Sequence, residues 1–243
     1  MKQLIRISLL LCALLTGVTA NSATPYDVTA RKADRFFSYG EWASASAMYS
    51  LMLDERTDSA RVFGNAIIAA GMTKQPEQQI ELFTRALDAH QPIDSVLRAT
   101  EQAALRADSA ALYEQFLYTV RQSDPWLSRV IDSKLLSYYL FRDNGPGIVT
   151  LSRVMLEGLP DNERFLYSLA RGQMLCDDIP SAIDTYRHIN SLYPGSLDAL
   201  LFLGNYYATR EPELARGYLQ KALDIRWTPY IAAKLSKLEH PRH

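Results

Sequence analysis

The sequence predicts an all-α protein whose helical hairpins repeat and stack into a right-handed α-solenoid. Three observations support this fold class. Apolar and small residues recur at helical spacing in the segment 163–194, a similar segment follows from residue 197, and no Gly/Ser-rich linker divides the chain after its first twenty residues. A single hairpin cannot bury its apolar face alone, so we expect neighbouring hairpins to stack into a continuous core.

The segment 163–194 shows the hairpin pattern most clearly. Along its expected first helix, one face carries a stripe at the 3.6-residue period, made of Leu166, Leu169, Ala170 and Gln173. The expected second helix repeats this spacing with Ala182, Tyr186 and Ile189. Pro180 falls in the first turn of the second helix, where no backbone donor is needed, and Pro194 ends that helix.

The following segment resembles the tetratricopeptide repeat, whose 34-residue pattern is W-x2-L-G-x2-Y, then A-x3-F, then P. Its first helix carries Leu200-x2-Leu203-Gly204-x2-Tyr207, and its second helix carries Ala215, Leu219 and Ala222, one residue early. The resemblance implies that the first helices of successive units line a concave groove, which binds peptides or folded proteins.

Counting along the chain in steps of this repeat period gives six expected units and a capping helix. They are 26–59, 60–93, 94–128, 129–162, 163–196 and 197–229, with the cap near 230–239. The third unit is expected to be divergent, because the distance along the sequence from Ala60 to Arg129 is one residue more than two periods. We place the additional residue at His90–Pro92. In the fourth unit, the turn formers of Arg142–Gly147 predict a projecting loop.

Residues 1–20 have the features of a secretory signal peptide. Lys2 and Arg6 provide a positive start, residues 7–15 are mostly apolar, and Val18–Ala20 form a small-residue cleavage site. We therefore expect cleavage near Ala20 and export of a single domain, 21–243, to the periplasm or the medium. The only expected link to a membrane is the signal peptide itself, if it stays uncleaved.

The charge balance and the cysteines exclude several classes of protein. The chain has 26 basic and 27 acidic residues, and without Lys2 and Arg6 the balance is 24 to 27, which argues against a nucleic-acid partner. Cys176 is the only cysteine left after removal of the signal peptide, so no internal disulfide is expected. We expect Cys176 to pack as a small buried apolar residue.

The sequence contains no recognisable catalytic or metal-binding arrangement. None of the four histidines has a second ligand at helical spacing, and neither a G-x-S-x-G nucleophile turn nor a phosphate-binding glycine loop occurs. Asp177 and Asp178 lie at a turn between helices, where aspartate is favoured as an N-cap. We predict a protein that is not an enzyme and has no metal and no cofactor.

The predicted binding groove lies on the first helices of units four to six. Arg164, Tyr167 and Arg171 share one helix face, because residues three and four apart are neighbours. The two arginines are expected to contact carboxylates, with Tyr167 packed between them. The candidate groove residues are Lys134, Arg164, Tyr167, Ser168, Arg171, Phe202 and Asn205. A solvated helix face is the alternative interpretation.

The best-known peptide-binding site of the tetratricopeptide family, a clamp for a C-terminal carboxylate, is largely absent from this chain. Of its lysine, asparagine and arginine positions, only Asn65 matches. Ala30 and Asp34 stand where a lysine and an asparagine are expected, and Val96 stands near the position of another lysine. The comparison disfavours an adaptor for chaperone tails.

The leading hypothesis is a non-catalytic scaffold of the cell envelope that binds a partner protein or peptide in the groove. Two alternatives stay open. The chain could bind glycan or peptidoglycan fragments on the rings of Trp42, Trp126 and Trp227, or it could assemble with itself as a structural component.

Overall fold

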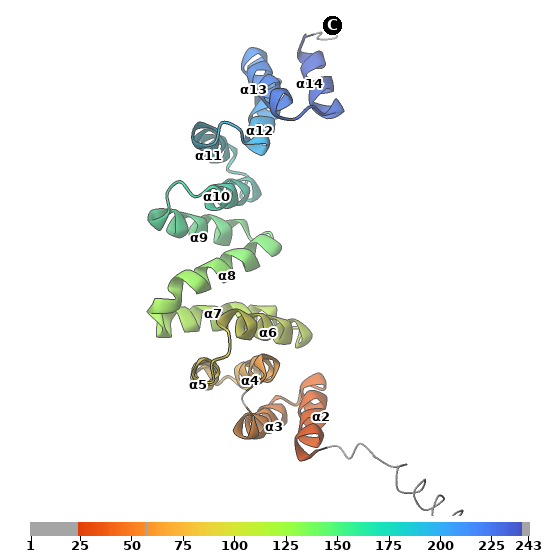
Figure 1. Cartoon of the computed structure of the whole chain (residues 1–243), viewed down its shortest axis with the longest axis vertical. Coiled ribbons are helices and arrows are strands. Elements are labelled where there is room, and N and C mark those ends of the chain that lie inside the picture. The colour runs from red at the N-terminus through yellow and green to blue at the C-terminus, as the bar shows by residue number, and fades with distance from the viewer. Residues whose placement is uncertain (1–23, 57, 240–243) are drawn as a thin grey trace, which may run out of the picture. The chain divides into compact units, whose positions relative to one another are not determined.

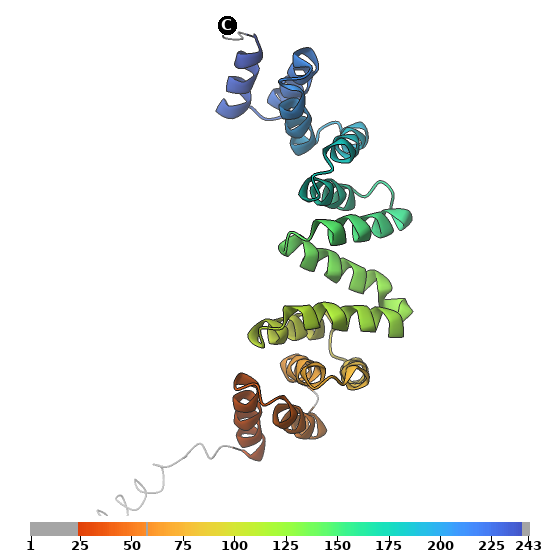
Figure 2. The same cartoon turned by 180° about the vertical axis from the view of Figure 1, so that it is seen from behind.

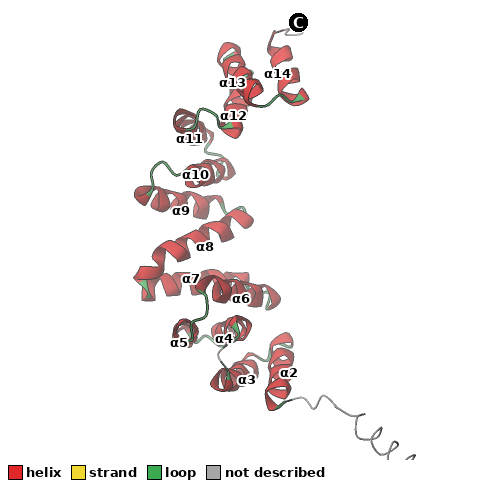
Figure 3. Cartoon of the chain, viewed as in Figure 1, coloured by secondary structure: helices red, strands yellow, loops and turns green. Residues whose placement is uncertain are grey.

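The computed structural model describes residues 24–56 and 58–239, and within these ranges the regular elements are all helices (Figures 1 and 3). The predicted all-α fold is confirmed. The expected signal peptide, 1–20, lies outside the described residues. None of the described helices combines the length and the apolar character that crossing a membrane requires.

In the described part of the chain, the helices follow one another as six pairs and a final helix (Figures 1 and 2). The first helices of the pairs are α2 (Pro25–Ser38), α4 (Ala60–Met72), α6 (Ile93–Arg106), α8 (Ser128–Phe141), α10 (Glu163–Leu175) and α12 (Leu197–Tyr207). The second helices are α3 (Trp42–Glu55), α5 (Pro76–Asp88), α7 (Ala110–Ser123), α9 (Gly145–Gly158), α11 (Ile179–Leu192) and α13 (Pro212–Ile225). A short 3-10 helix, η1 (Pro125–Leu127), precedes α8, and α14 (Pro229–Glu239) follows the last pair. To within one residue, each pair falls in the range expected for one unit.

Polar side chains and prolines define where many of these helices begin. The side chain of Thr24 accepts a hydrogen bond from the backbone of Asp27, whose carboxylate in turn accepts one from the backbone of Thr24. Five further N-cap side chains accept a backbone N–H: Ser59, Asn144, Asn162, Asp178 and Ser196. Proline stands in the first turn of α2, α5, α9, α11 and α13, where its missing N–H costs no hydrogen bond.

The turns within the first five helix pairs contain a left-handed residue at a nearly constant spacing. Backbone φ is positive at Gly40, Lys74, Asp108, Asp143 and Asp177. Successive members of this series are one repeat period apart, except that the interval from Asp108 to Asp143 is one residue longer. The N–H of the next residue then bonds a carbonyl of the preceding helix, as Gln75 does to Ala70 at 3.0 Å. The turn residue therefore marks the repeat even in the third unit, whose apolar pattern is weak.

This spacing corrects the position of the additional residue in the third unit. It is not at His90–Pro92, because Lys74 and Asp108 are separated by one repeat period. The additional residue instead lies between Asp108 and Asp143, where two helices of 14 residues, α7 and α8, follow each other.

The predicted projecting loop at Arg142–Gly147 and the predicted burial of Cys176 are both wrong. Gly145 and Gly147 belong to the first turn of α9, where the N–H of Gly147 donates to Asn144 Oδ1 at 3.1 Å. A Cβ atom on Gly145 would lie 2.8 Å from the sulfur of Cys176, so glycine serves close packing at this position. Cys176 itself is exposed.

The chain divides into two compact units, an N-terminal unit up to Ser123 and a C-terminal unit from Asp124 onward. In each unit the small residues expected at helix contacts are buried: Ala33 and Ala45 in the first, and Ala170, Ala182, Gly204, Ala215 and Ala222 in the second. Large rings fill the remaining space, as Phe83 and Phe116 do with an edge-to-face contact of 5.7 Å between centroids. The core of each unit thus runs between its stacked helices.

The backbones of α4 and α6 approach each other closely at Gly64. A Cβ atom at this position would lie 2.5 Å from the carbonyl carbon of Ala99 and 2.6 Å from the backbone nitrogen of Thr100. Only glycine allows α4 and α6 to pack this closely. This contact holds the first helices of the second and third hairpins beside each other.

Candidate functional site

A depression of about 410 Å³, the N-terminal pocket, lies on the first helices of the N-terminal unit. It is lined by Asp34, Phe37, Ser38, Tyr49, Arg61, Asn65 and Arg106. Asp34 comes from α2, Arg61 and Asn65 come from α4, and Arg106 is the last residue of α6. Three successive hairpins therefore contribute first-helix side chains to one pocket.

A chain of hydrogen bonds crosses the N-terminal pocket. Arg106 Nη2 donates to Asn65 Oδ1 at 2.6 Å, and Asn65 Nδ2 donates to the Tyr49 hydroxyl at 2.9 Å. The Tyr49 hydroxyl donates to Asp34 Oδ1 at 2.8 Å. Arg61 Nη1 donates to both oxygens of Asp34, at 3.2 and 3.1 Å. The chain links side chains from four helices.

Tyr49 fixes the direction of these hydrogen bonds. Burial, followed by the hydrogen bond to Asp34, raises the pKa of Tyr49 far above its ordinary value, so the hydroxyl keeps its proton. Since the Asp34 carboxylate only accepts, Tyr49 donates to it and accepts from Asn65. The amide of Asn65 must then present its oxygen to Arg106. Asn65 is only 2% exposed, so the orientation of its amide is held by the surrounding packing.

The two arginines of the pocket differ in their partners. Arg61 forms an ion pair with Asp34 at 3.1 Å, and with side-chain exposures of 56% and 43% this pair contributes little to stability. Arg106 is exposed, and its guanidinium carbon lies 5.9 Å from the centroid of the Phe37 ring. Among the described residues Arg106 has no carboxylate partner. Its positive charge is therefore not balanced within the pocket.

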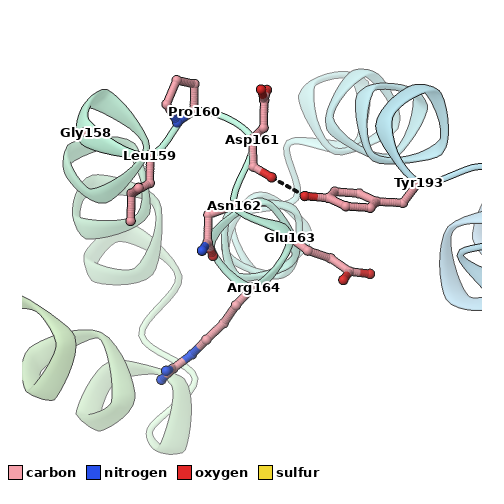
Figure 4. A pocket seen from close by; sticks show the side chains of 8 residues that line it. All are labelled: Gly158, Leu159, Pro160, Asp161, Asn162, Glu163, Arg164 and Tyr193. Carbon is pink, nitrogen blue, oxygen red and sulfur yellow. Dashed lines mark hydrogen bonds between the residues drawn. The ribbon is translucent and has the colours of Figure 1, made fainter.

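A second depression, of about 510 Å³, lies in the C-terminal unit at the turn between α9 and α10 (Figure 4). It is lined by residues 158–164 and by Tyr193, whose hydroxyl donates to the backbone carbonyl of Asp161. Figure 4 shows Arg164 leaving α10 on the side away from Tyr193. Arg164 Nη2 reaches Ser137 Oγ on α8 at 3.5 Å, and no carboxylate among the described residues pairs with it.

Two of the predicted groove residues, Tyr167 and Phe202, belong to one aromatic row. The ring of Tyr167 meets Tyr186 edge-on at 6.1 Å, and Tyr186 stacks on Phe202 at 3.9 Å between centroids. The Tyr167 hydroxyl also forms a hydrogen bond with Ser196. These contacts direct the Tyr167 ring toward α11 and the hydroxyl toward the start of α12. From the sequence, Tyr186 is expected only to pack between helices.

The other predicted groove residues have separate surroundings. Arg171 forms an ion pair with Asp143 at 2.6 Å, and Asn205 Oδ1 lies 3.5 Å from the Tyr230 hydroxyl. Ser168 is buried and donates to the backbone carbonyl of Arg164 within its own helix, at 2.9 Å. Lys134 is half-buried on α8. The groove set as a whole stays a prediction.

The N-terminal pocket is not among the sites predicted from the sequence. Asn65 and Asp34 were considered only as positions of the family's clamp, and Arg106 lies 41 residues after Asn65, so no local spacing connects them. One signal was available in the sequence. Asn65 stands within the apolar run of α4, and a buried amide requires hydrogen-bond partners, which predicts polar neighbours on adjacent helices.

Among the described residues, no group of three or more His, Cys, Asp or Glu side chains is placed to hold a metal ion. In the N-terminal pocket the hydrogen-bond chain satisfies Asn65 and Tyr49 and ends in an arginine. A guanidinium keeps its proton and acts only as a donor, so the arrangement is suited to binding an acceptor.

Neither a protein-family model nor a curated protein matches the sequence, but several solved structures are similar. A proposed protein-binding protein from Bacteroides ovatus is 19% identical, with a TM-score of 0.50 over 75% of this chain and 97% of its own. The C-terminal part of a TPR repeat-containing protein from Cytophaga hutchinsonii is 13% identical, with a TM-score of 0.46 over 80% and 78% of the two chains. A tetratricopeptide repeat protein from Parabacteroides merdae is 13% identical, with a TM-score of 0.41 over 95% and 90%. The Bacteroides ovatus protein shares the fold of this chain.

Proposed function

We propose that this chain, a tetratricopeptide-repeat protein by its fold, is an exported, non-catalytic scaffold that binds a partner protein or peptide on its first helices in the cell envelope. The sequence of residues 1–20 supports export. The helical hairpins support binding, because stacked repeats present extended surfaces for partners.

The observation that carries this proposal is an open depression in each unit, with an arginine that has no carboxylate partner among the described residues. This arginine is Arg106 in the N-terminal unit and Arg164 in the C-terminal unit. Enclosed pockets that bury most of a ligand are typical of small-molecule sites, whereas neither of these depressions is a fully enclosed cavity. Arginines that become desolvated at the centre of an interface are frequent binding hot spots.

Partner capture from the native envelope tests the proposal. The chain from residue 21 onward is immobilised, incubated with a detergent extract of the envelope, crosslinked and washed. We expect one protein in stoichiometric amount, and we expect free soluble chain to compete for it. The double variant Arg106→Ala and Arg164→Ala should lose most of this protein. Recovery of no partner, together with hydrolytic activity of the purified chain, would overturn the proposal.

A matched control comes from exposed cations on second helices. Arg153 on α9 and Lys221 on α13 are both exposed. The double variant Arg153→Ala and Lys221→Ala removes the same number of charges and should capture the partner as well as the wild type does. Equal losses in both double variants would indicate general charge attraction and would contradict binding on the first helices.

Export has its own measurement. N-terminal sequencing of the protein recovered from its native cells should begin near Asn21, because the expected cleavage follows Ala20. A chain that begins at Met1 and fractionates with the cytoplasm would contradict the proposed location.

Two further measurements address the alternatives left open by the sequence. Trp126 and Trp227 are exposed in the C-terminal unit, so a change of tryptophan fluorescence on titration with glycans would favour the glycan-binding alternative. Sedimentation over a series of concentrations would detect self-assembly. We expect neither effect.

A further inference from the structure

We propose that the N-terminal pocket binds a carboxylate of the partner at Arg106 and Arg61, and that Asp34 competes with this carboxylate as an internal ligand. The inference rests on the proposed function and specifies the chemistry of one contact. Asp34 and Asn65 stand at two positions of the clamp described above, whereas Arg61 and Arg106, which would hold the carboxylate, lie outside its positions.

The first step is the position of Arg106. Its Nη2 atom is held at 2.6 Å by the oxygen of Asn65, whose amide is fixed in turn by Tyr49. A guanidinium has five N–H donors in a rigid planar arrangement, so holding one of them orients the rest. Arg106 therefore presents the remaining donors in a defined direction, and less conformational entropy is lost when an acceptor binds.

The second step is the shortage of acceptors near this charge. Among the described residues that line the pocket, Asp34 is the only carboxylate, and it already accepts hydrogen bonds from Tyr49 and Arg61. Counting Asp34, Arg61 and Arg106, the pocket has a formal charge of +1. A carboxylate that binds at Arg106 forms charge-assisted hydrogen bonds, which are about twice as strong as neutral ones.

The third step concerns Asp34. Its carboxylate occupies Arg61 in the same way as an external carboxylate would, and its negative charge repels such a ligand. Because both partners of this ion pair are exposed, the pair adds little to stability and can open without a large cost. Asp34 thus lowers the affinity of the pocket for the partner's carboxylate, and this competition does not depend on a change of the fold.

This competition leads to an unusual expectation for Asp34→Asn. The amide oxygen of asparagine can still accept the hydrogen bond from Tyr49, while the negative charge is removed and Arg61 is released. A substitution in the binding pocket should therefore tighten binding. A residue with a purely structural role would not have this effect.

The experiment uses the chain from residue 21 onward and three matched peptides. Acetyl-Ala-Ala-Glu-Ala-amide carries only a side-chain carboxylate, acetyl-Ala-Ala-Gln-Ala carries only a terminal carboxylate, and acetyl-Ala-Ala-Gln-Ala-amide carries none. Titrations are followed by the NMR signals of the Arg106 Nε–H and the Asn65 side-chain amide. We expect at least one acidic peptide to shift both signals and the neutral peptide to shift neither. The peptide that binds more tightly identifies the source of the carboxylate.

Three variants complete the test. Asp34→Asn should tighten binding of the acidic peptide at least threefold, and Arg106→Gln should weaken it at least tenfold. Arg98 is exposed on the same helix, so Arg98→Gln is the matched control and should leave binding unchanged. Melting curves of all variants establish that they fold, and Arg106→Lys, which keeps the charge, should retain part of the binding.

The outcomes distinguish this inference from the proposed function. If no acidic peptide binds the wild type or Asp34→Asn, or if Asp34→Asn weakens binding in a folded chain, the carboxylate pocket is wrong. If Arg106→Gln captures the envelope partner as well as the wild type does, the scaffold function stands and only the pocket is rejected. If the wild type captures no partner but the peptides bind as expected, the proposed function fails on its own.

Discussion

The N-terminal and C-terminal units place different side chains at equivalent positions of their helical hairpins. The turn residues Gly40 and Lys74 correspond to Asp143 and Asp177, with the same shift along the sequence in both cases. This shift also relates Asp34, Tyr49, Arg61 and Asn65 to Ser137, Ser152, Arg164 and Ser168. The arginine is retained, and serine stands at the other three positions.

The three serines change the interactions around the retained arginine. Arg61 contacts the Asp34 carboxylate at 3.1 Å, whereas Arg164 reaches only the hydroxyl of Ser137 at 3.5 Å. Ser168 bonds back to its own helix, and the buried hydroxyl of Ser152 has no hydrogen-bond partner in the described part of the chain. The hydrogen-bond chain of the N-terminal unit therefore has no counterpart in these positions of the C-terminal unit.

This difference shows which positions of the repeat are free to vary. Buried small residues such as Ala33 and Ala182 are constrained in both units, because they lie where helices meet. Exposed polar positions on the first helices, such as those of Arg61 and Arg164, are not constrained in this way. One scaffold therefore carries a connected polar pocket in one unit, and in the other an arginine that reaches only a serine hydroxyl.

Gly64→Ala should have the largest effect on stability. The equivalent position in the C-terminal unit is Tyr167, so this position of the repeat requires glycine in the N-terminal unit and not in the C-terminal unit. An added Cβ would meet the backbone of Ala99 at 2.5 Å, and backbone atoms cannot rotate away. We expect a loss of about 3 kcal/mol in unfolding free energy, at the upper end for overpacking. Urea unfolding followed by circular dichroism measures it. A loss below about 0.5 kcal/mol, which is usual for a surface substitution, would mean that α4 and α6 are further apart than described.

Ala182→Trp tests the equivalent tight packing of the C-terminal unit. Ala182 is fully buried on α11, and a large ring there must displace its neighbours. We expect destabilisation by roughly 1–3 kcal/mol. Thermal unfolding of the variant beside the wild type measures it, and a change of only a few tenths would show that the assigned helix register is wrong.

The double variant Arg164→Ala and Arg171→Ala tests the predicted groove of the C-terminal unit. Both side chains are exposed, and within the described part of the chain Arg171 pairs only with the exposed Asp143, so the melting transition should hardly move. Binding of the captured partner should weaken at least tenfold, equivalent to about 1.4 kcal/mol. Calorimetric titration measures it. Unchanged affinity would assign these arginines to a solvated helix face.

Ser137→Asp tests the comparison between the units directly. The substitution places a carboxylate beside Arg164, as Asp34 stands beside Arg61. If an internal carboxylate competes with the partner, affinity at the C-terminal surface should fall about threefold, or about 0.6 kcal/mol. Ser137→Asn is the neutral control. Equal affinities for the two variants would contradict competition by charge.

The smallest effect is expected at the turns, where both units should respond alike. Lys74 and Asp177 have φ values of 60° and 58°, a conformation that glycine adopts without strain. Lys74→Gly and Asp177→Gly should each stabilise the chain by about 0.5 kcal/mol, which is visible as a small rise in melting temperature. Destabilisation by either substitution would show that the side chain has a stabilising contact.

The sequence predicted the helical hairpins well because their spacing is set by residues that recur. Ala170, Ala182 and Gly204 are buried as expected, since a small residue is required wherever two helices meet. The exposure of Cys176 and the helical state of Gly145 were missed. Both depend on how one particular turn packs, and the repeat period carries no information about this.

The candidate site was predictable only in part. Arg164 was identified from its place on a first helix, whereas Arg106 and Tyr49 were missed. Their hydrogen bonds to Asn65 join residues 41 and 16 positions away, and they depend on the reach and direction of individual side chains. Helical periodicity predicts which face a residue occupies, but it does not predict which side chain on the next hairpin that residue meets.

The short turns of this fold also have a consequence for how the chain folds. From α2 to α11, paired helices are joined by three residues, and within each unit the substantial helix contacts join helices that are close together along the chain. Contacts of low sequence separation form quickly, because little loop-closure entropy is lost before they are made. In such arrays each hairpin is stabilised mainly by its neighbours, so terminal hairpins open more readily than central ones. We therefore expect amide hydrogen exchange to slow progressively from the outer helices of each unit toward its middle.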